Sequence, residues 1–292
     1  MKLRFTAFTA LAAALMLMPA GCGGEDGATG ERPSFPEAKR IDFPFVEGAG
    51  RAFLLSEHPE GDAWLVTHGD SSGALRLLWT TDPFAADPGW REVFAGVTGD
   101  ADGVFRPSGT SFLFMSFARH GDDGGDHLDL YEAPWTDEGA GSPVPLQALN
   151  TDGSEVFATA TAEGQIVFAA TREDGTGGND IYMARPEADG FRIEEIEGIN
   201  SPTTDSNPFI TPDGGTLIFY SEREGGFGSV DLYVTRRGAD GAWSAPVNLG
   251  EEVNTRGPDY APSLSADGKT LFFSRGPDIY AIDVAAVPAL AN

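Results

Sequence analysis

A tripeptide of one acidic, one aliphatic and one aromatic residue recurs along the chain at steps of 51, 51 and 47 residues. Its copies are Asp129-Leu130-Tyr131, Asp180-Ile181-Tyr182, Asp231-Leu232-Tyr233 and Asp278-Ile279-Tyr280. A degenerate copy, Leu77-Leu78-Trp79, lies one step earlier. A fixed period of this length is typical of repeat architectures, in which each copy forms one supersecondary unit.

A second marker, a glycine turn followed by an apolar run, occurs once in each copy and in the same phase. These glycines are Gly61, Gly109, Gly164, Gly214 and Gly268. Strand and turn signals alternate around both markers, and helical periodicity is nearly absent after the first residues. The sequence therefore predicts an all-β fold, a propeller of five four-stranded blades over about residues 51–284.

The last unit ends after DIYAIDV and lacks a fourth strand. The segment 40–47 (RIDFPFVE) is strand-like but has no unit of its own. We expect this segment to pair with the last blade and close the ring, because an open ring would expose sheet edges. The predicted organisation is a signal peptide at 1–21, a flexible tether at 22–39, the propeller at 40–284 and a tail at 285–292.

The N-terminal residues predict a targeting signal rather than a part of the folded domain. Lys2 and Arg4 precede an apolar stretch, residues 5–18, which has the length of a signal-peptide core. The following Pro19-Ala20-Gly21-Cys22 resembles the bacterial lipoprotein signal, which implies lipidation of Cys22, although Pro19 departs from the usual leucine. The alternative is an ordinary secretory signal with an incidental cysteine. Because Cys22 is the single cysteine of the chain, an internal disulfide is excluded.

Two stretches carry a family resemblance. SNPFITPDGGTLIFYSEREGGFGSVDLYV and YAPSLSADGKTLFFSRGPDIYAIDV resemble the WD40-like repeats of TolB-type bacterial β-propellers, strongly over residues 151–284 and weakly over 51–98. The resemblance implies a periplasmic or outer-surface propeller that serves as a binding or scaffolding module. It implies neither an enzyme nor a transferable ligand site.

An arginine follows the second strand of each of the last four units and precedes the aspartate of the tripeptide. The spacing suggests cross-strand ion pairs with a structural role. The predicted pairs are Arg119–Asp129, Arg172–Asp180, Arg223–Asp231 and Arg275–Asp278.

A further acidic residue lies nine positions before the glycine turn in four units, at Asp100, Glu155, Asp205 and Asp259. The first strands of a propeller line its central channel, so a ring of these carboxylates could hold a cation such as Ca²⁺. The alternative is that each carboxylate accepts backbone N–H groups of a loop. No other cofactor is expected.

No catalytic constellation is supported. The string GDSSG at residues 69–73 matches a nucleophile elbow, but a strand rather than a helix follows it. The four histidines form no HExxH pair. The net charge of −26 argues against nucleic-acid binding, since an acidic surface repels phosphate backbones.

From these features we expect a monomeric, lipid-anchored protein of the bacterial cell envelope, on the periplasmic side or the outer surface. Its propeller would bind a protein or peptide without catalysis, on the face built from second-to-third-strand loops and interblade loops. Membrane contact would be through the N-terminal lipid alone. The alternatives are a carbohydrate-binding or carbohydrate-active propeller, of the glycosidase or lectin type, and a Ca²⁺-dependent structural module.

Overall fold

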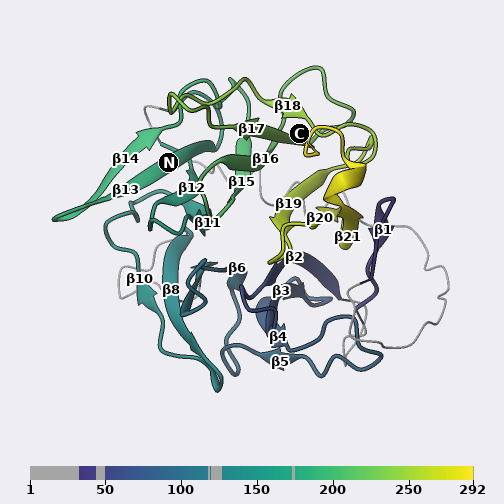
Figure 1. Cartoon of the computed structure of the whole chain (residues 1–292). Coiled ribbons are helices and arrows are strands. Elements are labelled where there is room, and N and C mark those ends of the chain that lie inside the picture. The colour runs from purple at the N-terminus through teal and green to yellow at the C-terminus, as the bar shows by residue number, and fades with distance from the viewer. Residues whose placement is uncertain (1–32, 44–49, 118, 120–126, 173–174, 292) are drawn as a thin grey trace. The chain divides into compact units, whose positions relative to one another are not determined.

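The computed structural model describes residues 33–43, 50–117, 119, 127–172 and 175–291, and these form five antiparallel β-sheets arranged in a ring (Figure 1). The sheets belong to one compact unit, Ser34–Asn292. Each sheet is one blade, so the predicted all-β, five-bladed propeller is confirmed. Among the described residues, no helix has the length and apolar character needed to span a bilayer.

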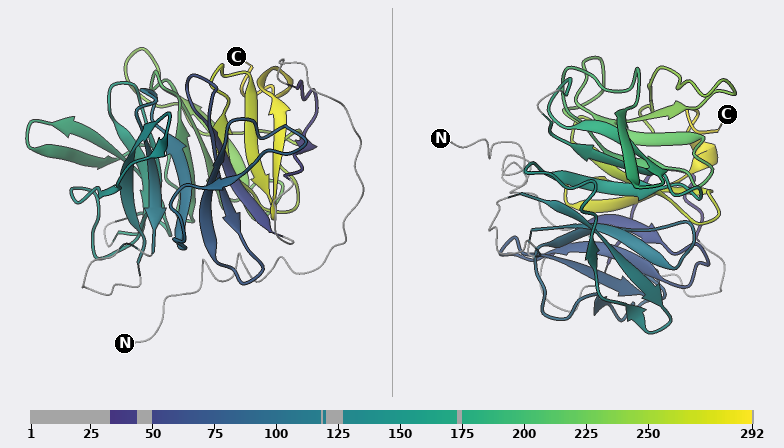
Figure 2. Two further views of the ribbon diagram at one scale, coloured as in Figure 1. Left: turned by 90° about the horizontal axis from the view of Figure 1, so that it is seen from below. Right: turned by 90° about the vertical axis from the view of Figure 1, so that its left-hand side faces the viewer.

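The strands of each blade follow the chain from the channel outward. Blade 1 consists of β2 (Arg51–Glu57), β3 (Trp64–Gly69), β4 (Leu75–Thr80) and β5 (Arg91–Glu92). Blade 2 consists of β6 (Asp100–Phe105), β7 (Ser111–Ser116), β8 (Asp129–Thr136) and β10 (Val144–Pro145), with β9 (Gly139–Ala140) paired to the end of β8. Blade 3 consists of β11 (Glu155–Ala160), β12 (Ile166–Ala170), β13 (Asp180–Glu187) and β14 (Gly190–Glu195), whose outer hairpin projects from the ring (Figure 2).

Blade 4 consists of β15 (Asp205–Ile210), β16 (Thr216–Ser221), β17 (Asp231–Arg236) and β18 (Val247–Asn248). Blade 5 consists of β19 (Asp259–Leu264), β20 (Thr270–Arg275), β21 (Asp278–Asp283) and β1 (Lys39–Arg40), and the short 3₁₀ helix η1 (Val284–Ala286) follows it. We call the side with the first-to-second-strand turns the hairpin face. The opposite side, with the second-to-third-strand loops and the interblade connections, is the loop face.

The glycine marker has a direct structural cause. Each marker glycine lies in the turn between the first and second strands, with φ between +69° and +84°. Residues with a Cβ rarely adopt this left-handed conformation, so glycine recurs at this one point of every blade.

The N-terminal segment closes the ring, as the sequence predicted. Strand β1 pairs antiparallel with β21, opposite Tyr280 and Ala281. Strand β1 is shorter than the strand expected over 40–47, and residues 44–47 of that segment lie outside the described residues. Phe35, which precedes this segment, also belongs to the core, since it is only 5% exposed.

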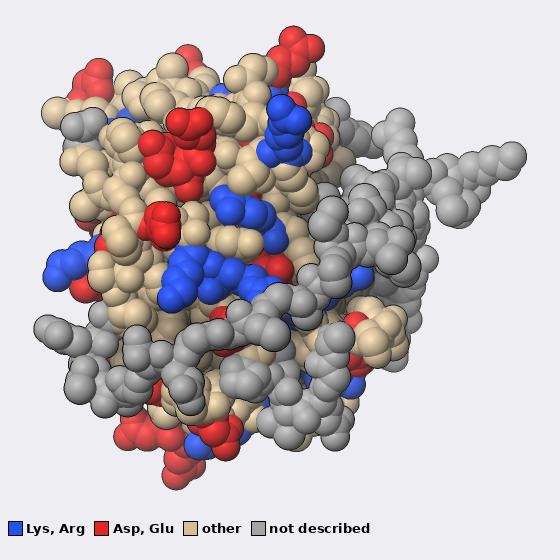
Figure 3. Space-filling view, turned by 90° about the vertical axis from the view of Figure 1, so that its right-hand side faces the viewer, with Lys and Arg blue, Asp and Glu red and all other residues tan. Residues whose placement is uncertain are grey.

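Blade 5, where the ring closes, has two further features. The C-terminal segment packs against blades 4 and 5, since Val287 is fully buried in a cluster with residues of both, such as Val234 and Leu271. On the side of the molecule that carries β1, Lys and Arg side chains gather among acidic ones (Figure 3). Arg40 of β1 contributes ion pairs with Asp42 and Asp278.

Every innermost strand contains one bulge at the same place. The pairing register shifts there, and one non-glycine residue adopts positive φ, between +46° and +57°. These residues are Leu54, Asp102, Phe157, Asn207 and Ala261. A bulge bends its strand and increases the local twist, so the five bulges together shape the channel. The residue types share no pattern, which is why the sequence did not reveal them.

Candidate functional site

The four recurring arginines form ion pairs with different partners from those expected. Each contacts the acidic residue that begins the first strand of its own blade, rather than the aspartate of the tripeptide. The pairs are Arg119–Asp100 at 2.6 Å, Arg172–Glu155 at 3.8 Å, Arg223–Asp205 at 2.7 Å and Arg275–Asp259 at 2.8 Å. The predicted pairing with Asp129, Asp180, Asp231 and Asp278 is therefore corrected.

Strand register explains the choice of partner. In blade 5, Arg275 lies opposite both Asp259 and Asp278 in the sheet. Asp259 is fully buried and needs a cation, whereas the Asp278 side chain is 42% exposed. In blade 4, Asp231 accepts the backbone N–H groups of Phe227 and Gly228 instead, and so fixes the glycine-rich loop.

Each carboxylate of the proposed cation ring is thus ion-paired with an arginine. Backbone N–H groups add to this: Thr151 donates to Glu155, Ser201 to Asp205 and Thr255 to Asp259, at 2.5–2.8 Å. Within the described part of the chain, no group of three or more His, Cys, Asp or Glu side chains is arranged to hold a metal ion. Burial nevertheless raises the pKa of Glu155 and of Asp259.

An asparagine that the sequence analysis missed completes each of three interblade joints. Asn150, Asn200 and Asn254 each accept a backbone N–H from the third strand of the preceding blade and donate back to the carbonyl of the same residue. The signal was available in the sequence. The pattern Asn-[Thr/Ser]-x-x-x-[Asp/Glu] occurs at LNTDGSE, INSPTTD and VNTRGPD, in the units where the repeat is strongest.

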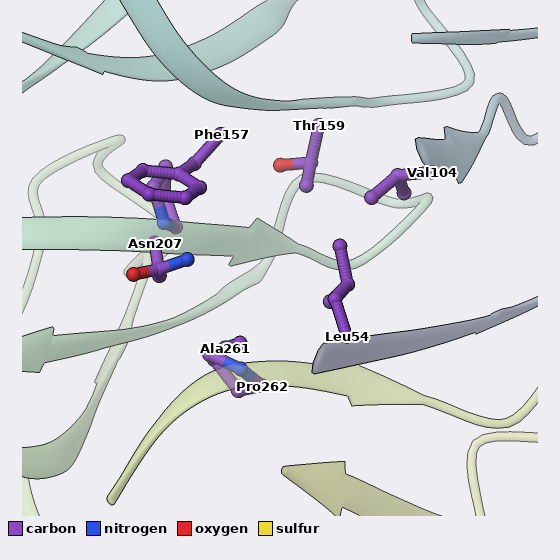
Figure 4. A pocket seen from close by; sticks show the side chains of 8 residues that line it. Leu54, Val104, Phe157, Thr159, Asn207, Ala261 and Pro262 are labelled. Carbon is purple, nitrogen blue, oxygen red and sulfur yellow. The ribbon is translucent and has the colours of Figure 1, made fainter. Parts of the chain in front are cut away.

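The central channel narrows at the level of the bulges. Side chains from the innermost strands of all five blades face one small space there, of about 10 Å³ (Figure 4). The lining residues are Leu54, Val104, Phe157, Thr159, Asn207, Pro208, Ala261 and Pro262. This volume is about the room that one water molecule needs, so the bulges form a constriction rather than an open pore.

Asp102, the bulge residue of blade 2, is buried against blade 1. Its carboxylate accepts a hydrogen bond from the Thr67 hydroxyl at 3.2 Å. The backbone N–H of Asp102 donates to the hydroxyl oxygen of Thr67 at 2.7 Å. Burial raises the pKa of Asp102 from 3.8 to about 7, because a low-dielectric site disfavours the charged form.

We expect this carboxyl to make the stability of the protein depend on pH. Between about pH 4 and pH 7 the folded state keeps a proton that the unfolded state has lost, so the free energy of unfolding falls as the pH rises. The expected fall is about 2 kcal/mol between pH 5 and pH 7. Urea unfolding at a series of pH values measures it.

The variant Asp102→Asn should show a flatter pH profile and higher stability than the wild type at pH 8. The exposed Asp189→Asn, at the β13–β14 turn, is the matched control and should keep the wild-type slope. Some slope should remain in both variants, because burial also raises the pKa of Asp180, Glu155 and Asp259. An equal slope in Asp102→Asn and the wild type would contradict the assignment.

The channel widens on the hairpin face into a cavity of about 200 Å³, which we call the hairpin-face cavity. All five blades contribute to its wall, at the ends of the first strands. The lining residues are Ser56, Glu57, Pro59, Val104, Phe105, Pro107, Thr159, Ala160, Phe209, Ile210, Thr211, Pro212, Leu264, Ser265, Ala266 and Gly268. Converging walls of this kind are where small ligands usually bind.

The loop face is different, because aromatic side chains pack near the channel there. Tyr260 and Ala261 form a buried cluster with Val230, against which Phe53 and Tyr220 pack. Two of the four exposed large apolar side chains among the described residues belong to loops of this face, Phe117 at 40% and Phe227 at 49% exposure. The other two, Val144 and Val247, lie in the outermost strands of blades 2 and 4.

The string GDSSG, which matches a nucleophile elbow in sequence only, forms a turn in the structure. GDSSG connects β3 and β4, where Asp70 accepts the N–H and the hydroxyl of Ser72 at 2.8 and 2.5 Å. The predicted lipidation site, Cys22, lies outside the described residues.

No family model and no curated protein matches the chain. Among solved structures, TolB of Agrobacterium tumefaciens is similar with a TM-score of 0.50 and 20% identity, covering 76% of this chain and 69% of that one. A glycoside hydrolase gives a TM-score of 0.55 at 10% identity, covering 86% and 91%. The alpha-L-arabinofuranosidase of Lactobacillus brevis gives 0.53 at 11%, covering 80% and 90%. These likenesses show a propeller fold of the TolB type.

The same comparisons correct the expectation that the chain is not an enzyme. That expectation came from the repeat and from the lack of a recognised motif. Because a glycoside hydrolase and an arabinofuranosidase share the fold over most of their length, a propeller of this kind does not argue against catalysis.

Proposed function

We propose that this protein is a binding module of the bacterial cell envelope, which docks a protein or peptide partner on its loop face. The observation that carries the proposal is the pair of exposed aromatic side chains, Phe117 and Phe227, on that face. Aromatic residues held out to solvent on a fixed backbone are typical anchors of protein interfaces.

The loop that presents Phe227 has a defined conformation. The N–H groups of Phe227 and Gly228 donate to the buried Asp231 carboxylate, at 2.6 and 3.2 Å. An anchor that is already positioned loses little conformational freedom on binding. The net charge of −26 favours a partner with basic groups, since complementary charge accelerates encounter.

The location of the protein is part of the same proposal. Lipidation of Cys22 would fix the chain to a membrane, with the segment that follows as a tether to a monomeric propeller. The support is the order of charged, apolar and small residues before Cys22 in the sequence.

Site-specific crosslinking in intact cells tests the docking face. A photoreactive phenylalanine at position 227 should give a defined adduct, and the same group at position 247 should not. Val247 is a suitable control because it is 53% exposed but lies on the outermost strand β18. We expect Phe117→Ala to weaken the adduct formed from position 227. Equal labelling from both positions, or labelling from neither, would overturn the proposal.

A second candidate is a carbohydrate-active or carbohydrate-binding propeller, which the shared fold of the glycoside hydrolase and the arabinofuranosidase favours. The hairpin-face cavity offers hydroxyl groups and one carboxylate, Glu57, to such a ligand. Release of nitrophenol from 4-nitrophenyl α-L-arabinofuranoside, or retention on a glycan array, would raise this candidate above the first. The absence of both signals would remove it.

A further inference from the structure

The hairpin-face cavity continues into the constriction of the channel, because Val104 and Thr159 line both spaces. The cavity, of about 200 Å³, is bounded mostly by apolar side chains such as Phe105, Phe209 and Leu264. The constriction, of about 10 Å³, has room for one group of the size of a water molecule. A ligand that enters from the hairpin face therefore meets an apolar chamber first and a small space beneath it.

Two polar side chains at the constriction keep hydrogen-bonding capacity. Asn207, the bulge residue of blade 4, is 6% exposed, and no described residue forms a hydrogen bond with its amide group. Thr159 is 4% exposed, and its Oγ1 accepts the N–H of Ile210 at 3.2 Å, but its hydroxyl proton has no acceptor among the described residues. Both side chains border the same small space (Figure 4). Because a buried polar group without a partner is costly, the constriction favours a ligand group that both donates and accepts hydrogen bonds.

The wall of the hairpin-face cavity offers mainly apolar contact. Two of its hydroxyl groups are already used within the hairpin turns, since Thr211 donates to the Asp213 carboxylate at 2.5 Å and Ser265 donates to the Asp267 carboxylate at 2.6 Å. Prolines and aromatic or aliphatic side chains make up most of the remaining wall. A molecule with an apolar body therefore fits this cavity better than one with hydroxyl groups on every side, such as a sugar.

We propose that the channel binds a neutral molecule with a single hydroxyl group, which lies in the constriction between Asn207 and Thr159 while the apolar body fills the hairpin-face cavity. The ligand oxygen accepts from the Thr159 hydroxyl, and the ligand O–H donates to the Asn207 side-chain oxygen. None of the described residues that line the constriction is charged, which favours a neutral head group. A body of about six to eight carbon atoms suits the volume of about 200 Å³, since a cavity of about 150 Å³ holds benzene.

Binding of benzyl alcohol to the full chain at pH 7 tests the proposal, with ethylbenzene as the comparison. The two probes share the ring and nearly the same shape, and they differ by a hydroxyl in place of a methyl group. Ligand-observed NMR gives both dissociation constants, and their ratio is compared between variants, so the hydrophobicity of each probe cancels. We expect the wild type to bind benzyl alcohol. Failure to bind it would leave the constriction to water alone and overturn the proposal.

The variant Thr159→Val should lower the preference for benzyl alcohol over ethylbenzene about fivefold, since valine keeps the shape but removes the donor. Thr161→Val is the matched control. Thr161 lies just after the same strand, is also 4% exposed and accepts the N–H of Gln165 at 3.2 Å, but it lines neither space. Equal ratios of the two dissociation constants in both variants would overturn the proposal.

The variant Asn207→Leu tests the second hydrogen-bond partner. Leu54 occupies the matching bulge position of blade 1 with the same φ of +46°, so this backbone conformation accommodates leucine. We expect the preference for benzyl alcohol to fall about fivefold, because the amide that accepts the ligand hydroxyl is gone. A preference equal to that of the wild type would refute the role assigned to Asn207.

A measurement on the wild type does not depend on how the variants fold. Nuclear Overhauser effects from the CH₂ protons of benzyl alcohol should reach the methyl groups of Val104 and Thr159, which line both spaces. The methyl groups of Val234, buried in the core between blades 4 and 5, are the control and should give none. Effects at Val234 in place of Val104 would put the probe elsewhere and overturn the proposal.

The hydroxyl group could belong to a free molecule or to a tyrosine side chain of a polypeptide. Comparison of 4-methylphenol with N-acetyl-tyrosinamide separates the two sources. Tighter binding of the blocked tyrosine indicates a polypeptide ligand and tighter binding of 4-methylphenol a free molecule, and both results support the site. The cavity opens on the opposite face from Phe227, so failure of this proposal would leave the loop-face proposal standing.

Discussion

Replacing Arg223 by methionine should lower the free energy of unfolding by about 3–5 kcal/mol, because it leaves a buried carboxylate without its cation. Arg223 Nη2 lies 2.7 Å from Asp205 Oδ1 and donates to the carbonyl of Ile199 at 2.7 Å. Asp205 is fully buried. Methionine keeps much of the apolar stem of arginine, so the loss reports mainly on the charge and the hydrogen bonds.

The aromatic neighbours make this arginine more than an ion-pair partner. Its guanidinium lies over the rings of Phe219 and Tyr233, with centroid distances of 5.3 and 4.9 Å. The same stacking recurs at Arg172 and Arg275. One side chain thus joins the first strand, the second strand, the third strand and the preceding interblade connection, which explains why it recurs in the repeat.

The matched control is Arg192→Met on the projecting β13–β14 hairpin. Arg192 pairs with Glu187 at 3.5 Å and with Glu194 at 3.4 Å, but its side chain is 58% exposed. Surface pairs contribute little, so the expected loss stays below about 1 kcal/mol. Urea unfolding of both variants gives the comparison, and equal losses would refute the role assigned to Arg223.

A double-mutant cycle separates the charge from the packing. With Arg223→Met in place, Asp205→Asn removes the uncompensated charge and should recover part of the lost stability. In the wild-type background the same substitution should destabilise. A coupling of the two substitutions near zero would mean that the pair acts through independent contacts.

The architecture was readable in the sequence because local rules repeat in it. Gly214 and Gly268 mark turns that require positive φ, and the tripeptide marks the third strand of the blade. Ring closure followed from counting strands, since the last unit was one strand short. These features depend on backbone conformation and pairing, which act on neighbouring residues.

The ion-pair partners of the recurring arginines could not be predicted from the sequence in this way. Arg275 is close in sequence to Asp278 but contacts Asp259, which lies 16 residues before it. Burial of Asp259 decides the pairing, and burial depends on how the blades pack. The hairpin-face cavity shows the same limit, because Glu57 and Ala266 come from opposite ends of the propeller sequence and meet only when the ring closes.

Replacing Phe35 by alanine should cost about 3–5 kcal/mol of stability, a value typical of buried phenylalanines. Phe35 is 5% exposed and packs in a cluster with Trp64, Phe272 and Ile279 of blades 1 and 5. Its N–H donates to Asp283 at 2.9 Å, and its carbonyl accepts from the Asp283 N–H at 2.7 Å. The side chain therefore anchors the closing strand to the last blade.

Because Phe35 lies at the closing strand, its replacement should loosen this strand locally as well as lower the free energy of unfolding. Loosening of the closing strand exposes the edge of β21. In the Phe35→Ala variant, amide hydrogens at the β1 pairing should therefore exchange faster than those of blade 3. One of them is the N–H of Ile41, which donates to the Ile279 carbonyl at 2.9 Å. Phe227→Ala is the control, because that phenylalanine is 49% exposed and should change stability by less than about 0.5 kcal/mol. Urea unfolding and hydrogen exchange measure both effects, and uniform acceleration across all blades would show that Phe35 supports the whole core rather than the closure.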